Sequence, residues 1–199
     1  MRSVGNALVS SSRTFNLLSI KRWIAQPATP DELMVRYATQ GDAETLAQLY
    51  DQCADTLYYY LLVLTEPDHA ADIAQKTWLK VIEQRHAYRS QNKFEAWLFT
   101  LGRHILLDEI RKNRKVEINN VLVADYEQPA DTHVVLSDAV DFHSALKQLP
   151  FAQREAFSLQ QEGFSLVQIA HICHTPVETI KTRLRYARQS LKIALEKQA

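Results

Sequence analysis

The chain is poor in several residue types, and each shortage excludes a class of protein. Its 199 residues include only four glycines and two cysteines, and no apolar run reaches the length of a membrane span. So few glycines argue against a nucleotide-cradling loop and against a sheet-rich fold. Cys53 and Cys173 both fall within apolar patterns, which argues against a disulfide framework and suits a reducing cytosol.

Charged residues are unevenly distributed along the chain. The formal net charge is zero, but residues 31–75 hold one basic and nine acidic side chains, and residues 76–115 hold ten basic and four acidic ones. Residues 116–146 hold six acids and no base, and residues 176–199 hold six bases and two acids. This alternation predicts basic surfaces suited to nucleic acid, separated by acidic surfaces that avoid it.

Apolar periodicity predicts an all-α fold of two small helical domains joined by an acidic linker. We expect residues 1–30 to form a flexible extension, 31–115 a first domain, 116–137 an extended linker, and 138–199 a second domain. In the first domain, Asp31 is expected to cap the first helix, and further helices are expected after Gly41-Asp42, from Pro67 and from Phe94 to the basic run that ends at Lys115. The inward faces of the second and third helices are expected to include Tyr50, Trp78 and Ile82.

The second domain contains two closely spaced helix starts. Ser165 with Gln168 forms one capping-box pattern, and Thr175 with Glu178 forms another, with Pro176 at the first helical position. Two starts ten residues apart predict a helix-turn-helix. The second helix has an apolar face and a basic face (Lys181, Arg185, Arg188, Lys192), an arrangement that suits a phosphate-lined major groove. A solvated basic surface helix is the alternative interpretation.

Together these stretches resemble the extracytoplasmic-function (ECF) sigma factors of bacterial RNA polymerase, from about Gly41 to Lys115 and from Ala145 to Leu191. The resemblance rests on the order and spacing of these segments: Asp72–Leu79, Phe94–Leu98, Leu107–Lys112, Leu149-Pro150, Gln153–Glu155, Ile169-Ala170 and Thr179–Leu184.

The resemblance implies a role for each segment. The third helix, through Asp72, Gln75, Trp78 and Leu79, would bind the β′ clamp helices of core RNA polymerase, and the β flap would be a second polymerase contact. The −10 promoter element would be read and melted by Tyr88, Arg89, Asn92, Lys93, Arg103, Arg111, Lys112 and Arg114. The −35 element would be bound by Lys181, Thr182, Arg185 and Tyr186, while Arg183 and Arg188 hold phosphates or brace the domain.

The residues themselves leave several alternatives open. Trp78 suits core packing as well as an interface, and Phe94 and Trp97 are interpreted as core residues. Lys76 and His104 depart from the family, which usually has an acid and an asparagine there. The acidic linker either threads into the polymerase or is a plain tether.

One residue group invites a metal site. His171, Cys173 and His174 cluster at the end of a short helix, but without a second cluster we predict no metal and no cofactor. His174 stands where glycine is frequent and would pay a conformational cost in a left-handed turn.

We therefore expect a cytoplasmic, non-enzymatic initiation factor whose partners are core RNA polymerase, promoter DNA and an anti-sigma factor, without membrane insertion. Two rivals remain. One is a dimeric helix-turn-helix regulator that acts without polymerase, and the other is a recombinase, which the helical N-terminal half disfavours.

Overall fold

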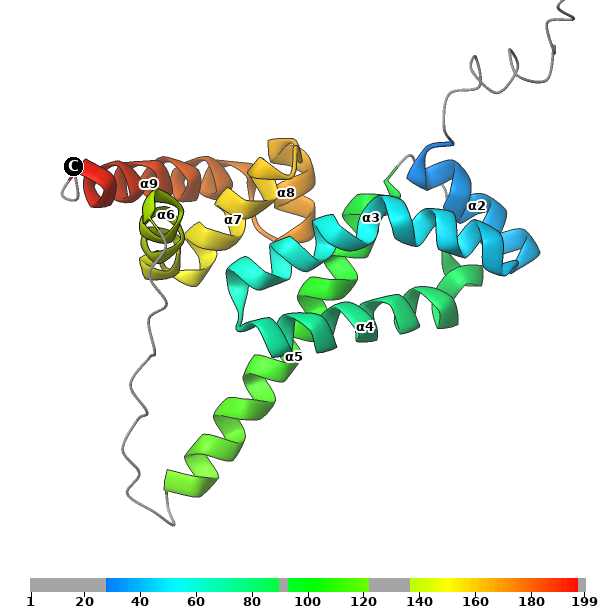
Figure 1. Ribbon diagram of the computed structural model, residues 1–199, viewed down its shortest axis with the longest axis horizontal. Coiled ribbons are helices and arrows are strands. Elements are labelled where there is room, and N and C mark those ends of the chain that lie inside the picture. Colours follow the sequence, from blue (N-terminus) through cyan, green and yellow to red (C-terminus); the bar gives the residue numbers. More distant parts are fainter. Residues whose placement is uncertain (1–27, 90–92, 122–136, 197–199) are drawn as a thin grey trace, which may run out of the picture.

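The computed structural model describes residues 28–89, 93–121 and 137–196, and within these the side chains of 114–121 and 137–141 are not described. The described residues contain helices and no strand, which confirms the all-α class. The helices are α2 (Pro30–Gln40), α3 (Ala43–Leu64), α4 (Pro67–Gln84), the short 3₁₀ helix η1 (Arg85–Ala87), α5 (Phe94–Val121), α6 (Ser137–Gln148), α7 (Phe151–Gln161), α8 (Leu166–Ile172) and α9 (Val177–Glu196) (Figure 1). Residues 1–27 of the predicted N-terminal extension, Asn92 and most of the linker lie outside the described residues. The predicted boundary after residue 30 is wrong, because Thr29 and Pro30 belong to the start of α2.

The cap of α2 differs from the prediction. Thr29, not Asp31, caps this helix, because the Thr29 hydroxyl accepts from the backbone N–H of Glu32 while the Glu32 carboxylate accepts from the backbone N–H of Thr29. This reciprocal pair satisfies two backbone donors at the helix start. The buried Asp31 carboxylate instead accepts hydrogen bonds from Tyr88 and Lys93, far from α2 in the sequence.

Helices α3, α4 and α5 pack around the core of the first part of the chain. Asp42 caps α3 by accepting from the Thr45 backbone N–H, and Pro67 occupies the first turn of α4. The expected apolar face of α3 is largely buried, but Tyr50 is half exposed, and Ile82 on α4 is 40% exposed. Both side chains line the solvent-exposed surface between α3 and α4, so the prediction that they point into the core was wrong.

Helix α5 is longer than predicted. It continues through the basic run to Val121, so residues 116–121 are helical and not part of an extended linker. Figure 1 shows this C-terminal part of α5 running out of the body of the molecule. The prediction was wrong there because it relied on apolar periodicity, which identifies only helices that bury one face.

The second part of the chain forms the predicted helix-turn-helix. Ser165 and Gln168 make the expected capping box at α8. The second predicted box is wrong: α9 begins at Val177, and the Thr175 hydroxyl donates to the Cys173 carbonyl instead of capping α9. His174 has a φ of 49°, which confirms the left-handed turn between the two helices.

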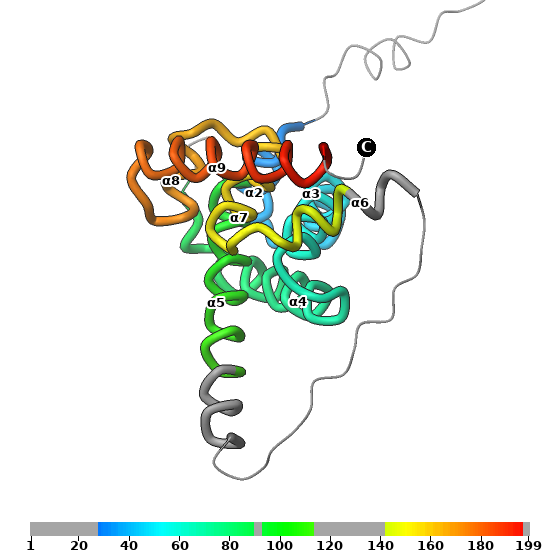
Figure 2. Tube along the Cα trace, turned by 90° about the vertical axis from the view of Figure 1, so that its left-hand side faces the viewer, coloured from blue at the N-terminus to red at the C-terminus, as the bar shows by residue number. Residues whose placement is uncertain are grey.

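The two expected domains pack directly on each other. α7 lies against both α9 and α3, and α8 lies against α5 (Figure 2). One hydrophobic cluster runs through both parts of the chain, joining residues such as Leu57 and Phe99 to Leu159, Phe164 and Ile169. A smaller cluster holds α6 on α9. The fold is therefore a closed arrangement of two helical units.

Candidate nucleic-acid interface

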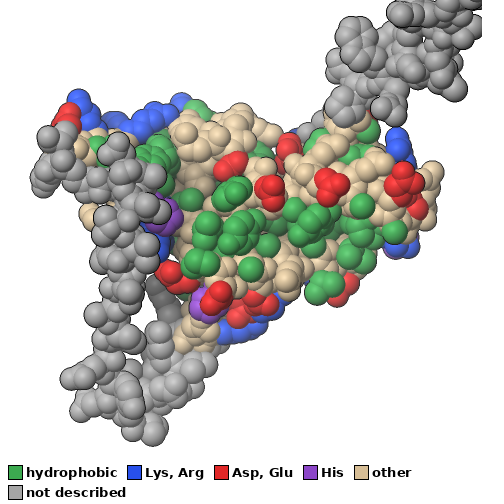
Figure 3. All heavy atoms as spheres, viewed as in Figure 1, with side chains coloured by type: hydrophobic (Ala, Val, Ile, Leu, Met, Phe, Trp, Pro, Cys, Tyr) green, Lys and Arg blue, Asp and Glu red, His purple; other side chains and the backbone are tan. Residues whose placement is uncertain are grey.

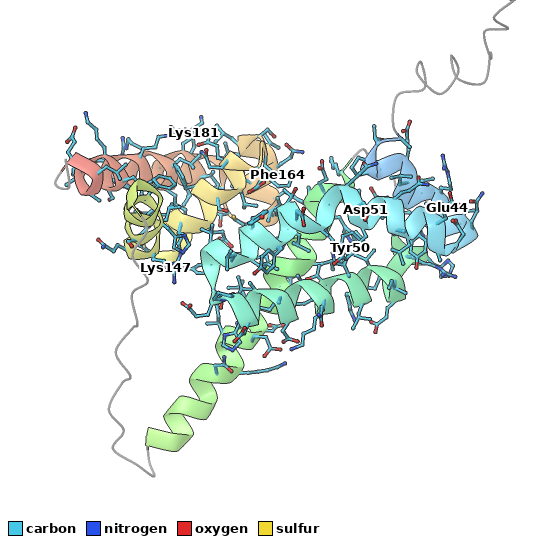
Figure 4. The ribbon with its side chains drawn as sticks, in the orientation of Figure 1. Glu44, Tyr50, Asp51, Lys147, Phe164 and Lys181 are labelled. Atoms are coloured by element: carbon cyan, nitrogen blue, oxygen red, sulfur yellow. The ribbon has the colours of Figure 1, made fainter. Side chains whose placement is uncertain are left out.

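An apolar groove lies between α3 and α4 on the face drawn in Figure 3, where hydrophobic side chains gather over these two helices. Its volume is about 480 Å³. Figure 4 places Tyr50 between the two helices, and its ring lies 5.0 Å from that of Trp78. Leu79 is 59% exposed at the rim, whereas Trp78 is only 6% exposed. Trp78 is thus a wall of the groove, and Leu79 and Gln75 are the side chains that a partner meets first.

Beside this groove, ion pairs of Lys76 link α4 to α5. Its ammonium lies 2.6 Å from the Asp72 carboxylate and 3.2 Å from that of Glu109, which also pairs with Lys112. The hydrogen bond to Asp72, and then that to Glu109, raises the pKa of Lys76, and the hydrogen bond from Lys76 lowers that of Glu109. These groups are solvent-exposed, so the network stabilises the fold little. At position 76, where the resemblance implies an acid, this chain has a cation that neutralises Asp72.

The segment that follows η1 holds the first promoter candidates. Tyr88 is 8% exposed, with its ring 5.2 Å from that of Trp97 and its hydroxyl donating to the Asp31 carboxylate. Arg89 is exposed, and one of its N–H groups donates to the His86 carbonyl. Lys93 is exposed as well. Tyr88 thus anchors the segment, while Arg89 and Lys93 are the side chains open to DNA.

Of the candidates on α5, Arg103 is engaged by the second part of the chain. Its guanidinium lies 2.7 Å from the carboxylate of Glu155 on α7, and the exposed fractions of the two side chains are 13% and 1%. Burial alone lowers the pKa of Arg103, but hydrogen bonding and charge from Glu155 outweigh it, so the pKa is raised. Arg111 and Lys112 are exposed, and the side chain of Arg114 is not described.

Two histidines meet at the same junction. The rings of His104 on α5 and His174 in the turn before α9 are stacked, with their Nε2 atoms 3.1 Å apart. One ring must donate and the other accept, so a doubly protonated pair loses this bond. Burial, and then the charge of His174, lowers the pKa of His104. The neighbouring charged groups are Arg103, Arg111 and Asp108 on α5, and His171 faces His174.

No group of three or more potential metal ligands gathers anywhere in the described part of the chain, including around His171 and His174. Cys173 and Cys53 are buried free thiols. Burial, and then the charge of Glu155, raises the pKa of Cys173 to about 12. These thiols are therefore poor nucleophiles and poor metal ligands in the closed arrangement.

Helix α9 divides into the two predicted faces. Ile180, Leu184, Ala187 and Leu191 are buried, whereas the cationic face is exposed along the upper edge in Figure 3. Figure 4 shows Lys181 pointing away from the other helices. Its ammonium lies 2.7 Å from Glu178, and the exposed Arg185 lies over the Tyr186 ring.

Two further arginines of α9 have partners inside their own unit. An N–H of Arg183 donates to the Thr175 hydroxyl in the turn, and an N–H of Arg188 donates to Gln160 of α7. The Thr182 hydroxyl donates to the Glu178 backbone carbonyl. The geometry of Arg183 and Arg188 favours bracing of the helix-turn-helix over contact with bases.

Sequence reasoning missed the residues that hold the two units together. In the sequence, Glu155 stands out only as part of the Gln153–Glu155 motif, although it lies on the buried face of α7 beside Ala156 and Leu159. An acid within an apolar helix face requires a cationic partner, and this signal pointed to an ion pair. Nothing in the sequence identified Arg103 as that partner, because 52 residues separate the two.

The arrangement defines a DNA-binding helix-turn-helix protein with an additional apolar docking groove. Residues 49–116 match the family model described as Sigma-70 region 2, and residues 139–191 match Sigma-70 region 4. The chain belongs to the ECF RNA polymerase sigma factors.

Its relatives span most of the chain. It is 33% identical over 130 residues to the ECF sigma factor EcfG of Rhodopseudomonas palustris, covering 64% of this chain and 72% of that protein. It is 25% identical over 173 residues to SigW of Bacillus subtilis, covering 79% and 92%.

Solved structures show the same fold. The sigma factor RpoE of Bartonella quintana, in complex with the anti-sigma factor NepR, superposes with a TM-score of 0.66 at 28% identity, over 77% of this chain and 98% of that one. CnrH, in complex with the cytosolic domain of CnrY, gives a TM-score of 0.60 at 20% identity, over 86% and 100%, which supports the fold alone.

As a sigma factor, this protein acts in transcription initiation, binding core RNA polymerase and promoter DNA. Within the described residues, no helix has the length and apolar character needed to cross a membrane.

Proposed function

We propose that residues 31–115 bind core polymerase and the −10 element, that residues 138–199 read the −35 element, and that the chain carries no catalysis of its own. The exposed basic face of α9 is the observation that supports this most strongly. It presents Lys181 and Arg185 to solvent while the opposite face is buried against the rest of its unit. Lysine and arginine at these positions bind guanine edges and phosphates in a major groove.

The α3–α4 groove is the proposed polymerase-binding surface. It is apolar, partly open, and rimmed by the exposed Leu79 and Gln75. Helical partners bind such grooves through apolar side chains. Asp72 contributes less negative charge to this contact than it would if position 76 held an acid, because Lys76 already pairs with it.

Promoter binding by both units requires the closed arrangement to open. The −10 and −35 elements lie about 25 base pairs apart, which is about 85 Å along B-DNA. In the closed arrangement, Arg103 pairs with Glu155 and His104 stacks on His174, so this side of α5 faces the second unit and not DNA. The fifteen residues of 122–136 reach at most about 50 Å when extended, which allows wide separation of the units.

An anti-sigma factor is a proposed partner. The similar sigma factor RpoE of Bartonella quintana was solved in complex with the anti-sigma factor NepR, which supports this proposal. We place the protein's action in the cytoplasm at promoter DNA. The acidic linker between the two units is the proposed segment that enters the polymerase.

Co-elution of the full chain with bacterial core RNA polymerase on size exclusion tests this proposal. We expect a one-to-one complex that initiates run-off transcription. Leu79→Asp should weaken the complex about 30-fold, the typical effect of losing a strong interface contact. Val35→Asp is the matched control, since Val35 is an exposed apolar residue of α2 outside the groove.

If the folded protein forms no complex and instead binds duplex DNA as a dimer, the regulator hypothesis replaces this one. If Val35→Asp weakens the complex as much as Leu79→Asp, the groove is not the docking surface.

A further inference from the structure

One buried carboxylate on α2 joins two points of the segment proposed to read the −10 element. The Asp31 Oδ1 accepts from the Tyr88 hydroxyl and from the Lys93 backbone N–H, at 3.2 Å in the second case. Asp31 is 8% exposed, and it takes no part in capping α2, which Thr29 and Glu32 cap. A single carboxylate thus fixes residues at both ends of the stretch 88–93.

Tyr88 is held from a second side by aromatic packing. Its ring lies 5.8 Å from that of Phe94, edge on, and 5.2 Å from that of Trp97. Burial, and then the hydrogen bond to Asp31, raises the pKa of Tyr88, so its hydroxyl stays protonated and donating at neutral pH. The aromatic ring is therefore an anchor directed into the fold and not a base-stacking platform.

The C-terminal end of α2 holds the start of the same stretch. The guanidinium of Arg85 lies over the Tyr37 ring at 5.6 Å and covers Gly41, the αL cap of α2. A Cβ built on Gly41 would lie 2.7 Å from an Arg85 nitrogen, so the guanidinium occupies the space that a side chain at this position would need. The N-terminal end of α2 thus contacts Tyr88 and Lys93, and its C-terminal end contacts Arg85.

We propose that α2 is the platform that positions Tyr88, Arg89 and Lys93 for −10 reading, with Asp31 as the positioning residue. This rests on the proposed function of that segment. Discrimination among bases requires contacts held within about 0.5 Å, and a segment released at Tyr88 and Lys93 loses that accuracy. The exposed Arg89 and Lys93 side chains still attract phosphates after such a release, so affinity for DNA survives while selectivity falls.

The test uses the full chain with core polymerase and templates that share one −35 element and differ by one −10 base at a time. A mismatched base pair ordinarily costs a factor of about 5 to 150 in binding. We expect Asp31→Ala and Tyr88→Phe to reduce the ratio of initiation rates between the best and mismatched −10 templates by about fivefold, at the low end of that range. Asp31→Asn keeps an oxygen acceptor and should restore most of the ratio.

Two readouts and one control variant separate positioning from loss of structure. Affinity for core polymerase and discrimination among single-base −35 variants should stay within about twofold of wild type, the spread expected of sites that do not interact. Ile73→Val is the control for general destabilisation, because it trims the buried core of the same unit about 18 Å along α4 from Arg85. It should leave the −10 ratio unchanged.

The inference is overturned if Asp31→Ala leaves the −10 ratio intact, or if −10 and −35 discrimination fall together, or if Ile73→Val lowers the −10 ratio equally. Failure of the proposed function looks different: the wild-type chain then neither binds core polymerase nor initiates from any template.

Discussion

The ion pair between Arg103 and Glu155 should control how tightly the two units stay together. Truncation by Glu155→Ala leaves the guanidinium without its partner at a site where only 13% of the Arg103 side chain is exposed. Removing one partner of a buried pair costs about 3 to 5 kcal/mol. Because Arg103 is not fully buried and is rehydrated when the units separate, we expect about 3 kcal/mol, which shifts the closed–open equilibrium about 100-fold toward the open form.

The rate at which the Cys173 thiol is chemically modified measures this opening. Cys173 is 3% exposed, and the charges of Glu155 and Arg103 act on its pKa, so it lies at the junction of the units. If Cys173 reacts only from the open form, Glu155→Ala should raise its modification rate by up to about 100-fold. Cys53 is the internal reference, because it is buried inside the first unit alone.

Three comparisons decide the outcome. Glu178→Ala breaks an ion pair with the same 2.7 Å separation but with both side chains more than half exposed, so it should cost at most about 1 kcal/mol. The charge exchange Arg103→Glu with Glu155→Arg should restore part of the protection. An unchanged Cys173 rate in Glu155→Ala refutes the reasoning, and an equal rise at Cys53 means global unfolding instead of opening.

Three further predictions concern the other surfaces. Lys181→Ala or Arg185→Ala should weaken −35 duplex binding about tenfold by fluorescence anisotropy, with polymerase affinity unchanged; equal loss of both would place the −35 surface elsewhere. Trp78→Ala should cost about 3 kcal/mol and lower the Tm, whereas Leu79→Ala should leave the Tm unchanged and weaken polymerase binding. Because burial lowers the pKa of His104 below 6.5, the open form binds more protons, so the closed form should weaken as pH falls through 6.5. Small-angle scattering should show this expansion, and His104→Gln should reduce it.

The sequence by itself determined the helices and the class of protein. Apolar periodicity and capping patterns predicted α3, α4, α8 and most of α9, because these signals are local and depend on neighbouring residues three or four positions apart. The basic face of α9 was also predicted correctly, since a helix fixes which side chains point together. Family motifs then supplied the resemblance that the comparisons confirm.

Tertiary structure alone decided which predicted site residues are open to a partner. Tyr88 and Arg103 carry the right chemistry for DNA, yet one is buried against Asp31 and the other is bound by Glu155. Each of these pairs joins residues more than fifty positions apart. No local pattern encodes such a pairing, because it arises from how the helices pack and from the requirement that a buried charge find its partner.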